Sequence, residues 1–146
     1  MRTILAVSNT SSKGKSATLK EFALILILKF PSHKIIFMFP SIIKPHGDFR
    51  LVIEINGKII AIESQGDPNT DLEHRLSDIC KNYKPDIIIC TCRTRGQTVD
   101  AVNKAASTFS YQKIWTSTYQ MDANHSIVNQ LKAKHILELL QTIKLI

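Results

Sequence analysis

The sequence predicts an α/β protein: a mostly parallel sheet in an α/β/α sandwich, with an antiparallel hairpin at residues 50–62. Short apolar runs alternate with longer segments of helical periodicity, which is typical of parallel strands joined by helices. The run at 87–91 is apolar without interruption, as expected for a strand covered on both faces. Asn56-Gly57 separates two runs of β-formers, and this dipeptide favours the type I′ turn of a tight hairpin.

The individual elements follow from local signals. An apolar strand at 3–8 leads into a polar loop at 9–14 and a very apolar helix at 15–29, which we expect to be well buried. Thr70 or Asp71 is expected to cap a helix that runs to about residue 83. The remaining predicted elements are strands at 34–39, 51–55, 58–62, 87–91 and 113–118, helices at 98–108 and 126–145, and a loop at 40–49.

The composition is that of an ordinary globular domain with a basic surplus. The chain has 146 residues, of which 44% are apolar and 21% charged. This balance excludes wholesale disorder, and the length predicts one domain over 1–146. No apolar run reaches the ~18 residues of a membrane span, and no secretory cleavage pattern is present, so we expect a cytoplasmic protein that does not bind membranes. The formal net charge of +7 favours anionic ligands.

Three cysteines, Cys80, Cys90 and Cys92, show neither a Cys-x-x-Cys pair nor a metal-ligand spacing with histidine. Cys90 and Cys92 are two residues apart in an apolar run, so on a strand they share one face. Buried reduced thiols are the favoured interpretation, and a redox or metal role is the alternative.

The polar loop carries most of a phosphate-binding pattern. Residues 9–16 match the last three positions of G-x-x-x-x-G-K-[ST], and Asn9 stands at the first glycine. We expect Asn9 to take an unusual backbone angle there, because Asn adopts positive φ more readily than most residues. The loop N–H groups and the following helix N-terminus would form a cradle for phosphate oxygens. The residues expected to bind the nucleotide here are Asn9, Thr10, Ser11, Ser12, Lys13, Gly14, Lys15, Ser16 and Ala17.

In this motif and its strand–loop–helix context, the chain resembles the P-loop NTPase superfamily. The resemblance implies a nucleoside triphosphate ligand with Mg²⁺, and often hydrolysis or phosphoryl transfer. Lys15 would reach the β- and γ-phosphates, and the Ser16 hydroxyl would hold Mg²⁺. The alternative is a polar surface turn that precedes a helix.

A second segment, Glu63-Ser64-Gln65-Gly66, is similar to the D-x-x-G segment of Ras-like GTPases, with Glu in place of Asp. A hairpin precedes this segment in that family as well. The similarity implies that Glu63 orients Mg²⁺, that the Gly66 N–H senses the γ-phosphate, and that Gln65 or Asp67 positions a water. The alternative for Glu63 is a solvated carboxylate leaving a strand.

The guanine-reading motif N/T-K-x-D of those GTPases is missing where the chain reads Trp115-Thr116-Ser117-Thr118-Tyr119-Gln120, so we prefer ATP to GTP. Arg93 and Arg95 follow the strand at 87–91. If that strand neighbours the first one, both arginines would emerge near the phosphates and stabilise transferred charge. A solvated basic loop, with Thr98 as helix cap, is the alternative.

The favoured function is therefore Mg²⁺-dependent nucleoside triphosphate binding with slow hydrolysis of the β–γ bond. The candidate catalytic residues are Lys15, Glu63, Arg93 and Arg95, and the candidate Mg²⁺ ligands are Ser16 and Glu63. One alternative is a nucleotide-binding regulatory module that binds a protein partner and does not hydrolyse. A small-molecule kinase and a nucleic-acid-associated protein are further alternatives; nucleic acid is not favoured, because the basic residues are scattered.

Overall fold

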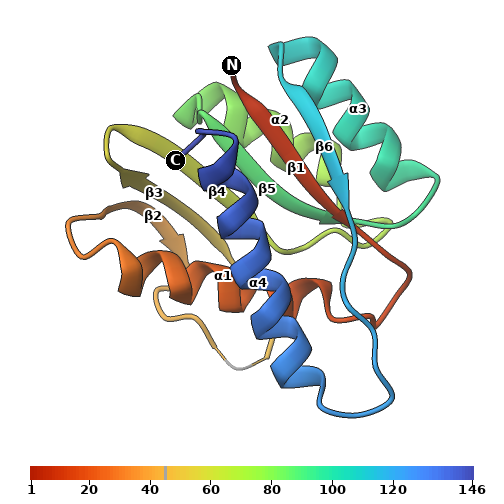
Figure 1. The fold of residues 1–146 in the computed structure, drawn as a ribbon. Helices are drawn as coiled ribbons and strands as arrows, with labels where there is room; N and C mark the ends of the chain where they lie inside the picture. Colours follow the sequence, from red (N-terminus) through yellow and green to blue (C-terminus); the bar gives the residue numbers. More distant parts are fainter. Residues whose placement is uncertain (45) are drawn as a thin grey trace.

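The structure, a computed structural model, describes residues 1–44 and 46–146 and consists of a six-stranded mixed sheet with four helices (Figure 1). Pro45, in the loop expected at 40–49, lies outside the described residues. The α/β class and the antiparallel hairpin are confirmed. The elements are β1 (Thr3–Ser8), α1 (Lys15–Lys29), β2 (Lys34–Phe39), β3 (Arg50–Ile55), β4 (Lys58–Glu63), α2 (Leu72–Tyr83), β5 (Ile87–Cys92), α3 (Gln97–Phe109), β6 (Gln112–Thr116) and α4 (His125–Thr142).

The sheet has the order β2-β3-β4-β5-β1-β6. β1 pairs in parallel with β5 and β6, and β4 pairs in parallel with β5, whereas β2, β3 and β4 pair antiparallel. The hairpin between β3 and β4 turns at Asn56 and Gly57, which both have positive φ, at 52° and 78°. This is the backbone conformation that a type I′ turn requires.

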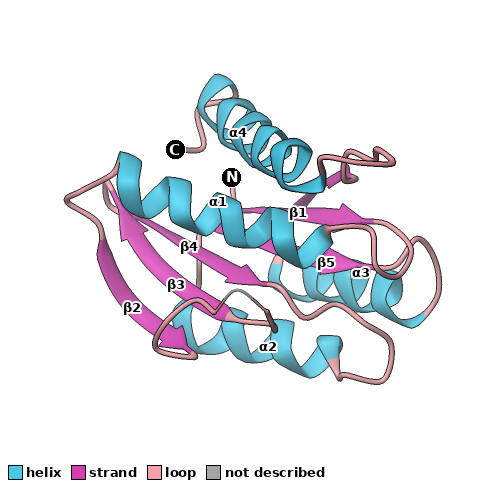
Figure 2. Ribbon diagram, turned by 90° about the horizontal axis from the view of Figure 1, so that it is seen from below, coloured by secondary structure: helices cyan, strands magenta, loops and turns pink. Residues whose placement is uncertain are grey.

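Helices α1 and α4 cover one face of the sheet, and α2 and α3 cover the other (Figure 2). On β1, Leu5 and Val7 pack in the core shared with α1 and α4, whereas Ile4 and Ala6 pack in the core shared with α2 and α3. Successive residues of a strand therefore face different helix layers, as the strand period of two demands. Because α1 lies on one face of the sheet, only alternate side chains at the end of a strand point toward the side of the loop that leads into α1.

Several local predictions need correction. α1 is buried on one side only, because it forms an outer layer: Leu28 is 81% exposed. Asp71 precedes α2 with a left-handed φ of 60° and makes no side-chain cap hydrogen bond, while the Thr70 hydroxyl donates to the Asp67 carbonyl. β6 ends at Thr116, two residues before the predicted end, so Thr118 is free to contact the loop after β1.

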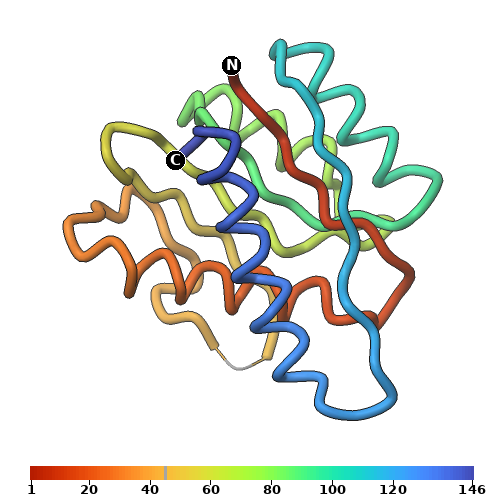
Figure 3. The backbone as a smooth tube through the Cα atoms, in the orientation of Figure 1, coloured from red at the N-terminus to blue at the C-terminus, as the bar shows by residue number. Residues whose placement is uncertain are grey.

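The three cysteines are free and buried, as predicted. No helix in the described part of the chain is both long and apolar enough to cross a membrane. The backbone trace shows both chain ends at the end of the sheet where β1 begins, away from the loop at 9–14 (Figure 3).

Candidate functional site

The loop at 9–14 joins the carboxyl end of β1 to the start of α1, as predicted. Ser8 and Cys92 end neighbouring parallel strands in register, and the Asn9 N–H donates to the Cys92 carbonyl at 3.2 Å. β1, β5 and β6 all end beside this loop (Figure 1). The loop therefore occupies the edge of the sheet at which open α/β proteins bind ligands.

The backbone N–H groups of residues 11–17 form a run of unpaired donors. Within the described residues none of them donates a hydrogen bond, and the first bond of α1 runs from the Thr18 N–H to the Gly14 carbonyl. No side chain caps α1, and its first turn has no acidic residue. The unpaired donors and the positive end of the helix dipole together favour a bound anion.

The tight turn of the loop lies at Ser12 and Gly14, which have φ values of 57° and 79°. Asn9 does not have a positive φ, so the expectation of an unusual backbone angle there is wrong. A Cβ on Gly14 would lie 2.7 Å from Asn129 Oδ1 on α4. The backbone conformation therefore favours glycine at this position, whereas the Asn129 side chain could move to make room for a Cβ.

The Asn9 side chain ties the loop to the segment that follows β6. Its Oδ1 accepts a hydrogen bond from the Thr10 N–H at 2.7 Å, and its Nδ2 donates to Thr118 Oγ1 at 2.9 Å. The Thr118 hydroxyl in turn donates to the Lys13 carbonyl at 2.6 Å. Asn9 thus contributes a side-chain contact that the glycine of the pattern could not make.

The Lys15 side chain folds back across the loop and is 7% exposed. Its Nζ donates to the carbonyls of Asn9 at 3.0 Å and Thr10 at 2.6 Å. Burial lowers the pKa of Lys15, and the nearby Arg93 lowers it further. In the described part of the chain Lys15 forms no ion pair with a carboxylate. A ligand anion at the loop would therefore meet a buried cation without a charged partner.

Ser16, at the start of α1, contacts a carboxylate that the sequence did not indicate. The Ser16 hydroxyl donates to Asp48 Oδ1 at 2.9 Å, with the Ser64 carbonyl at 3.1 Å as a second acceptor. Ser64 Oγ also donates to Asp48 Oδ1, at 3.1 Å. Asp48 thus links the start of α1 to the end of β4. The sequence had assigned this link to Glu63.

The Glu63 carboxylate contacts two arginines and not Ser16. Its Oε2 accepts a hydrogen bond from Arg50 Nε at 3.0 Å, and its Oε1 forms an ion pair with Arg75 Nε at 3.1 Å. Burial raises the pKa of Glu63, and the two arginines oppose that rise. Ile62 packs on the α1 face of the sheet, so Glu63, one residue on, lies on the α2 face with Arg75. The structure does not bring Glu63 to Ser16, which corrects the expectation that they form one metal site.

Gly66 crosses directly over the end of β5. A Cβ on Gly66 would lie 1.9 Å from the Thr91 backbone oxygen, a distance that no side chain tolerates. The Gln65 side-chain oxygen, expected to position a water, accepts a hydrogen bond from Arg75 Nη1 at 2.6 Å. Close packing on β5 therefore explains this glycine independently of any ligand.

Arg93 and Arg95 follow β5, which does neighbour β1. Ser8 Oγ donates to the Arg93 carbonyl at 2.9 Å, and the Arg93 guanidinium forms an ion pair with Asp67 at 3.1 Å. The Thr98 hydroxyl oxygen accepts a hydrogen bond from the Arg93 N–H at 2.8 Å, and Gly96 is the N-cap of α3, so Thr98 is not the helix cap that the alternative interpretation gave. Arg95 is exposed, with no hydrogen-bond or ion-pair partner among the described residues.

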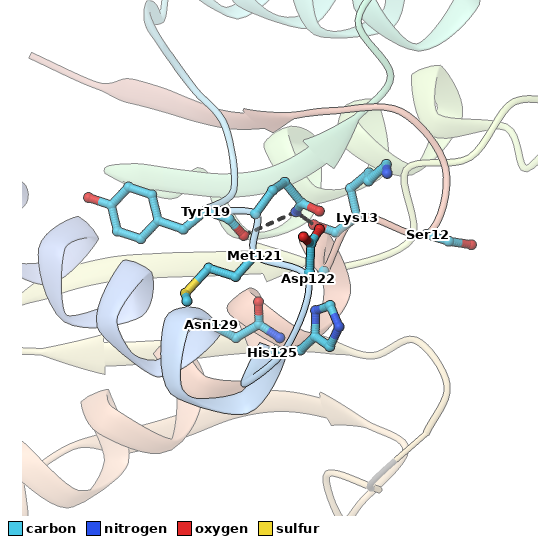
Figure 4. A pocket seen from close by; sticks show the side chains of 9 residues that line it. Ser12, Lys13, Tyr119, Met121, Asp122, His125 and Asn129 are labelled. Carbon is cyan, nitrogen blue, oxygen red and sulfur yellow. Dashed lines mark hydrogen bonds between the residues drawn. The ribbon is translucent and has the colours of Figure 1, made fainter.

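Two cavities flank the loop and share Ser12, Lys13 and Gly14. The small cavity, about 200 Å³, is bounded by residues 11–17 on one side and by Ser64, Gly66, Asp67 and Thr91 on the other. The large cavity, about 600 Å³, is bounded by the segment after β6 and by α4. Figure 4 shows Tyr119, Met121, Asp122, His125 and Asn129 around the large cavity, beside Lys13.

Sequence reasoning missed Asp48, Thr118, Gln120 and Asn129. Asp48 lies 32 residues from its partner Ser16, and Thr118 lies 109 residues from its partner Asn9. The only local signal was that Thr118 and Gln120 follow a predicted strand, at the sheet edge where ligands bind. Asp48 lies in a loop that precedes a strand, and this position gave no such signal.

The chain was compared with known proteins in three ways. No protein-family model matches it, and searches of curated proteins and of solved structures gave no significant match.

Proposed function

We propose that the chain binds a Mg²⁺-nucleoside triphosphate at residues 9–17 and slowly hydrolyses its β–γ bond, with ATP preferred to GTP. The observation that carries this proposal is the run of N–H groups at 11–17 that have no hydrogen-bond acceptor among the described residues, in a segment that lines the small cavity. Successive backbone donors beside a lysine at a helix N-terminus are the features by which proteins bind polyphosphates.

The small cavity suits the phosphates, and the large cavity suits the nucleoside. At about 600 Å³ the large cavity falls within the ~300–1,000 Å³ typical of organic-ligand sites, whereas the small one, about 200 Å³, lies below it. Because both cavities border Ser12, Lys13 and Gly14, one ligand can extend across the loop. Gln120 borders the large cavity, and its side-chain oxygen can contact a base, while its amide nitrogen donates to Lys13 and Thr118.

Ser16 and Asp48 are the residues that fit a magnesium ion. Both present oxygen atoms, the ligands that Mg²⁺ prefers, and their oxygens lie 2.9 Å apart beside the small cavity. No group of three or more His, Cys, Asp or Glu side chains could hold a metal in the described part of the chain, so phosphate oxygens and waters would complete the coordination. When bound, Mg²⁺ would neutralise charge on the β- and γ-phosphates.

In the hydrolytic step, water would attack the γ-phosphorus while the bond to the β–γ bridging oxygen breaks, which yields a diphosphate and inorganic phosphate. Lys15 would stabilise the charge that develops on the leaving oxygens. Arg93, which pairs with Asp67 at 3.1 Å, could assist in stabilising this charge. Binding without turnover is the second candidate, favoured by the occupation of Glu63 by Arg50 and Arg75.

Calorimetric titration of the wild-type chain with ATP and with GTP, each with Mg²⁺, tests the proposal. Lys15→Ala should weaken binding about 10- to 100-fold, because a charge-assisted contact to phosphate is lost. Lys29→Ala, an exposed lysine in the last turn of the same helix, is the matched control and should bind normally.

Phosphate release distinguishes the two candidates. Hydrolysis predicts release that disappears in Lys15→Ala and persists in Lys29→Ala. Tight binding without release above background would replace the enzyme with a nucleotide-binding module. If neither nucleotide binds to the wild-type chain, both candidates are wrong.

A further inference from the structure

The carbonyl of Lys13 is held by two side chains from the far end of the sequence. It accepts one hydrogen bond from the Thr118 hydroxyl at 2.6 Å and another from the Gln120 side-chain amide at 2.6 Å. A carbonyl oxygen has two lone pairs, so its acceptor capacity is filled. The peptide that joins Lys13 to Gly14 is therefore fixed on its oxygen side.

Thr118 is the centre of this arrangement. Its Oγ1 donates to Lys13 and accepts from both Asn9 Nδ2 at 2.9 Å and Gln120 Nε2 at 2.8 Å. One donated and two accepted bonds satisfy a hydroxyl completely, and Thr118 is 6% exposed. We call Asn9, Thr118 and Gln120 the loop brace.

The orientation of a peptide carbonyl also fixes the N–H of the same peptide. In a trans peptide the C=O and N–H bonds point in opposite directions within one plane. The loop brace draws the Lys13 oxygen toward the segment after β6, so the Gly14 N–H is directed away from it. Gly14 borders the small cavity, whose opposite wall is the segment after β4 and the end of β5.

We propose that Thr118, supported by Asn9 and Gln120, is a positioning residue that orients the Lys13–Gly14 peptide so that the Gly14 N–H donates to a bound phosphate. This inference rests on the proposed function. It also gives Asn9 a role: at the position of the first glycine in the pattern, its amide holds the brace to the start of the loop.

The brace also connects the two cavities. Gln120 borders the large cavity and donates to Lys13, while the Gly14 end of that peptide borders the small one. A nucleoside that contacts Gln120 would therefore influence the orientation of the Lys13–Gly14 peptide, whose N–H would donate to the phosphate. Phosphate binding should depend on Thr118 even for a ligand that has no base.

The test uses inorganic pyrophosphate with Mg²⁺ as the probe. Thr118→Val removes the hydroxyl while keeping the shape, and it should weaken pyrophosphate binding about 10-fold, the effect of one well-placed hydrogen bond. The pyrophosphate-induced shift of the Gly14 amide in ¹H–¹⁵N spectra should disappear. Thr118→Ser restores the hydroxyl and should restore both the affinity and the shift.

Thr116→Val is the matched control, because the Thr116 hydroxyl contacts Lys132 rather than the loop. It should bind pyrophosphate as the wild type does. Should Thr118→Val fail to fold, Gln120→Met at an exposed position removes one of the two bonds and should weaken binding about 3-fold.

The inference is overturned if folded Thr118→Val binds pyrophosphate normally and shows a normal Gly14 shift. The same results in Gln120→Met count where that variant replaces Thr118→Val. Either outcome would leave the proposed function intact. Failure of the wild-type chain to bind pyrophosphate, ATP and GTP would instead overturn the proposed function and the inference with it.

Discussion

The Ser16 hydroxyl and the Asp48 carboxylate lie 2.9 Å apart and connect the first turn of α1 to the segment before β3. Asp48 also accepts a hydrogen bond from Ser64, so one carboxylate links the two segments that border the small cavity. The neighbouring Glu63 points to the other face of the sheet and binds arginines. The acidic residue best placed for a metal at the loop therefore comes before the hairpin and not from its end.

This arrangement predicts different effects for two conservative substitutions. Asp48→Asn should remove most of the gain in ATP affinity that Mg²⁺ gives, about 10-fold, because an anionic ligand is replaced by a neutral one. Glu63→Gln should keep that gain. ATP titrations with and without Mg²⁺ measure both, and the reverse pattern would return the metal site to Glu63.

Gly66→Ala should destabilise the fold severely. The added Cβ would lie 1.9 Å from the Thr91 backbone oxygen, so either β5 or the 64–67 segment must move. We expect a loss of about 3 kcal/mol or more in the free energy of unfolding, measured by urea denaturation. The double variant with Thr91→Ala should remain destabilised, because the nearest atom is backbone; full recovery would show that the side chain was the obstacle.

Arg75→Met should cost much more stability than Lys104→Met. Arg75 pairs with Glu63 where the two side chains are 16% and 5% exposed, whereas Lys104 pairs with Glu73 at 64% and 56%. Removing a partner of a buried carboxylate costs about 2 kcal/mol when Arg50 remains, and an exposed pair contributes less than about 0.5 kcal/mol. Chemical denaturation compares the two, and equal losses would contradict the buried role of Arg75.

Arg75→Met should also loosen the segment at 64–67, because Arg75 holds both the side-chain and the backbone oxygen of Gln65. Hydrogen exchange of the amides in that segment should accelerate. Exchange in β1 should accelerate only by the amount that the loss in the free energy of unfolding accounts for. Unchanged exchange at 64–67 would mean that packing on Thr91 alone holds the segment.

ATP binding should weaken as pH rises through the alkaline range. Burial and Arg93 lower the pKa of free Lys15, and a bound phosphate would raise it by stabilising the charged form. Above the pKa of the free protein, binding must then take up a proton, so affinity falls with increasing pH. Calorimetry in buffers of different ionisation enthalpy measures that uptake, which Lys15→Arg should abolish because arginine stays charged.

Local sequence signals were sufficient for most of the fold. Asn56-Gly57 fixed the hairpin because its turn needs two positive φ values, which both residues adopt. The unbroken apolar run in β5 indicated a strand buried on both faces, and every residue of β5 is buried. These features depend on neighbours in the sequence, which is why they could be predicted.

The site was less predictable because it depends on register and on distant contacts. A shift of one residue in the register of β4 reverses the two faces of the strand. Such a shift would exchange the faces of Glu63 and Ser64, so the register decides which of them lies on the α1 face. Asp48 and Thr118 meet the loop only when the sheet is assembled. The positions of Lys15 and Ser16 could be predicted because a strand, a loop and a helix in sequence order place them together.

The position of β5 between β1 and β4 has a geometric consequence for the small cavity. The loop after β1 and the segment after β4 emerge two strand spacings apart, about 9.6 Å. Thr91, near the end of β5, supplies the floor between these two walls. Because hydrogen bonding within the sheet sets this spacing, the separation of the two backbone segments does not depend on side-chain rotamers. The segment at 64–67 can cross that floor only because Gly66 has no side chain.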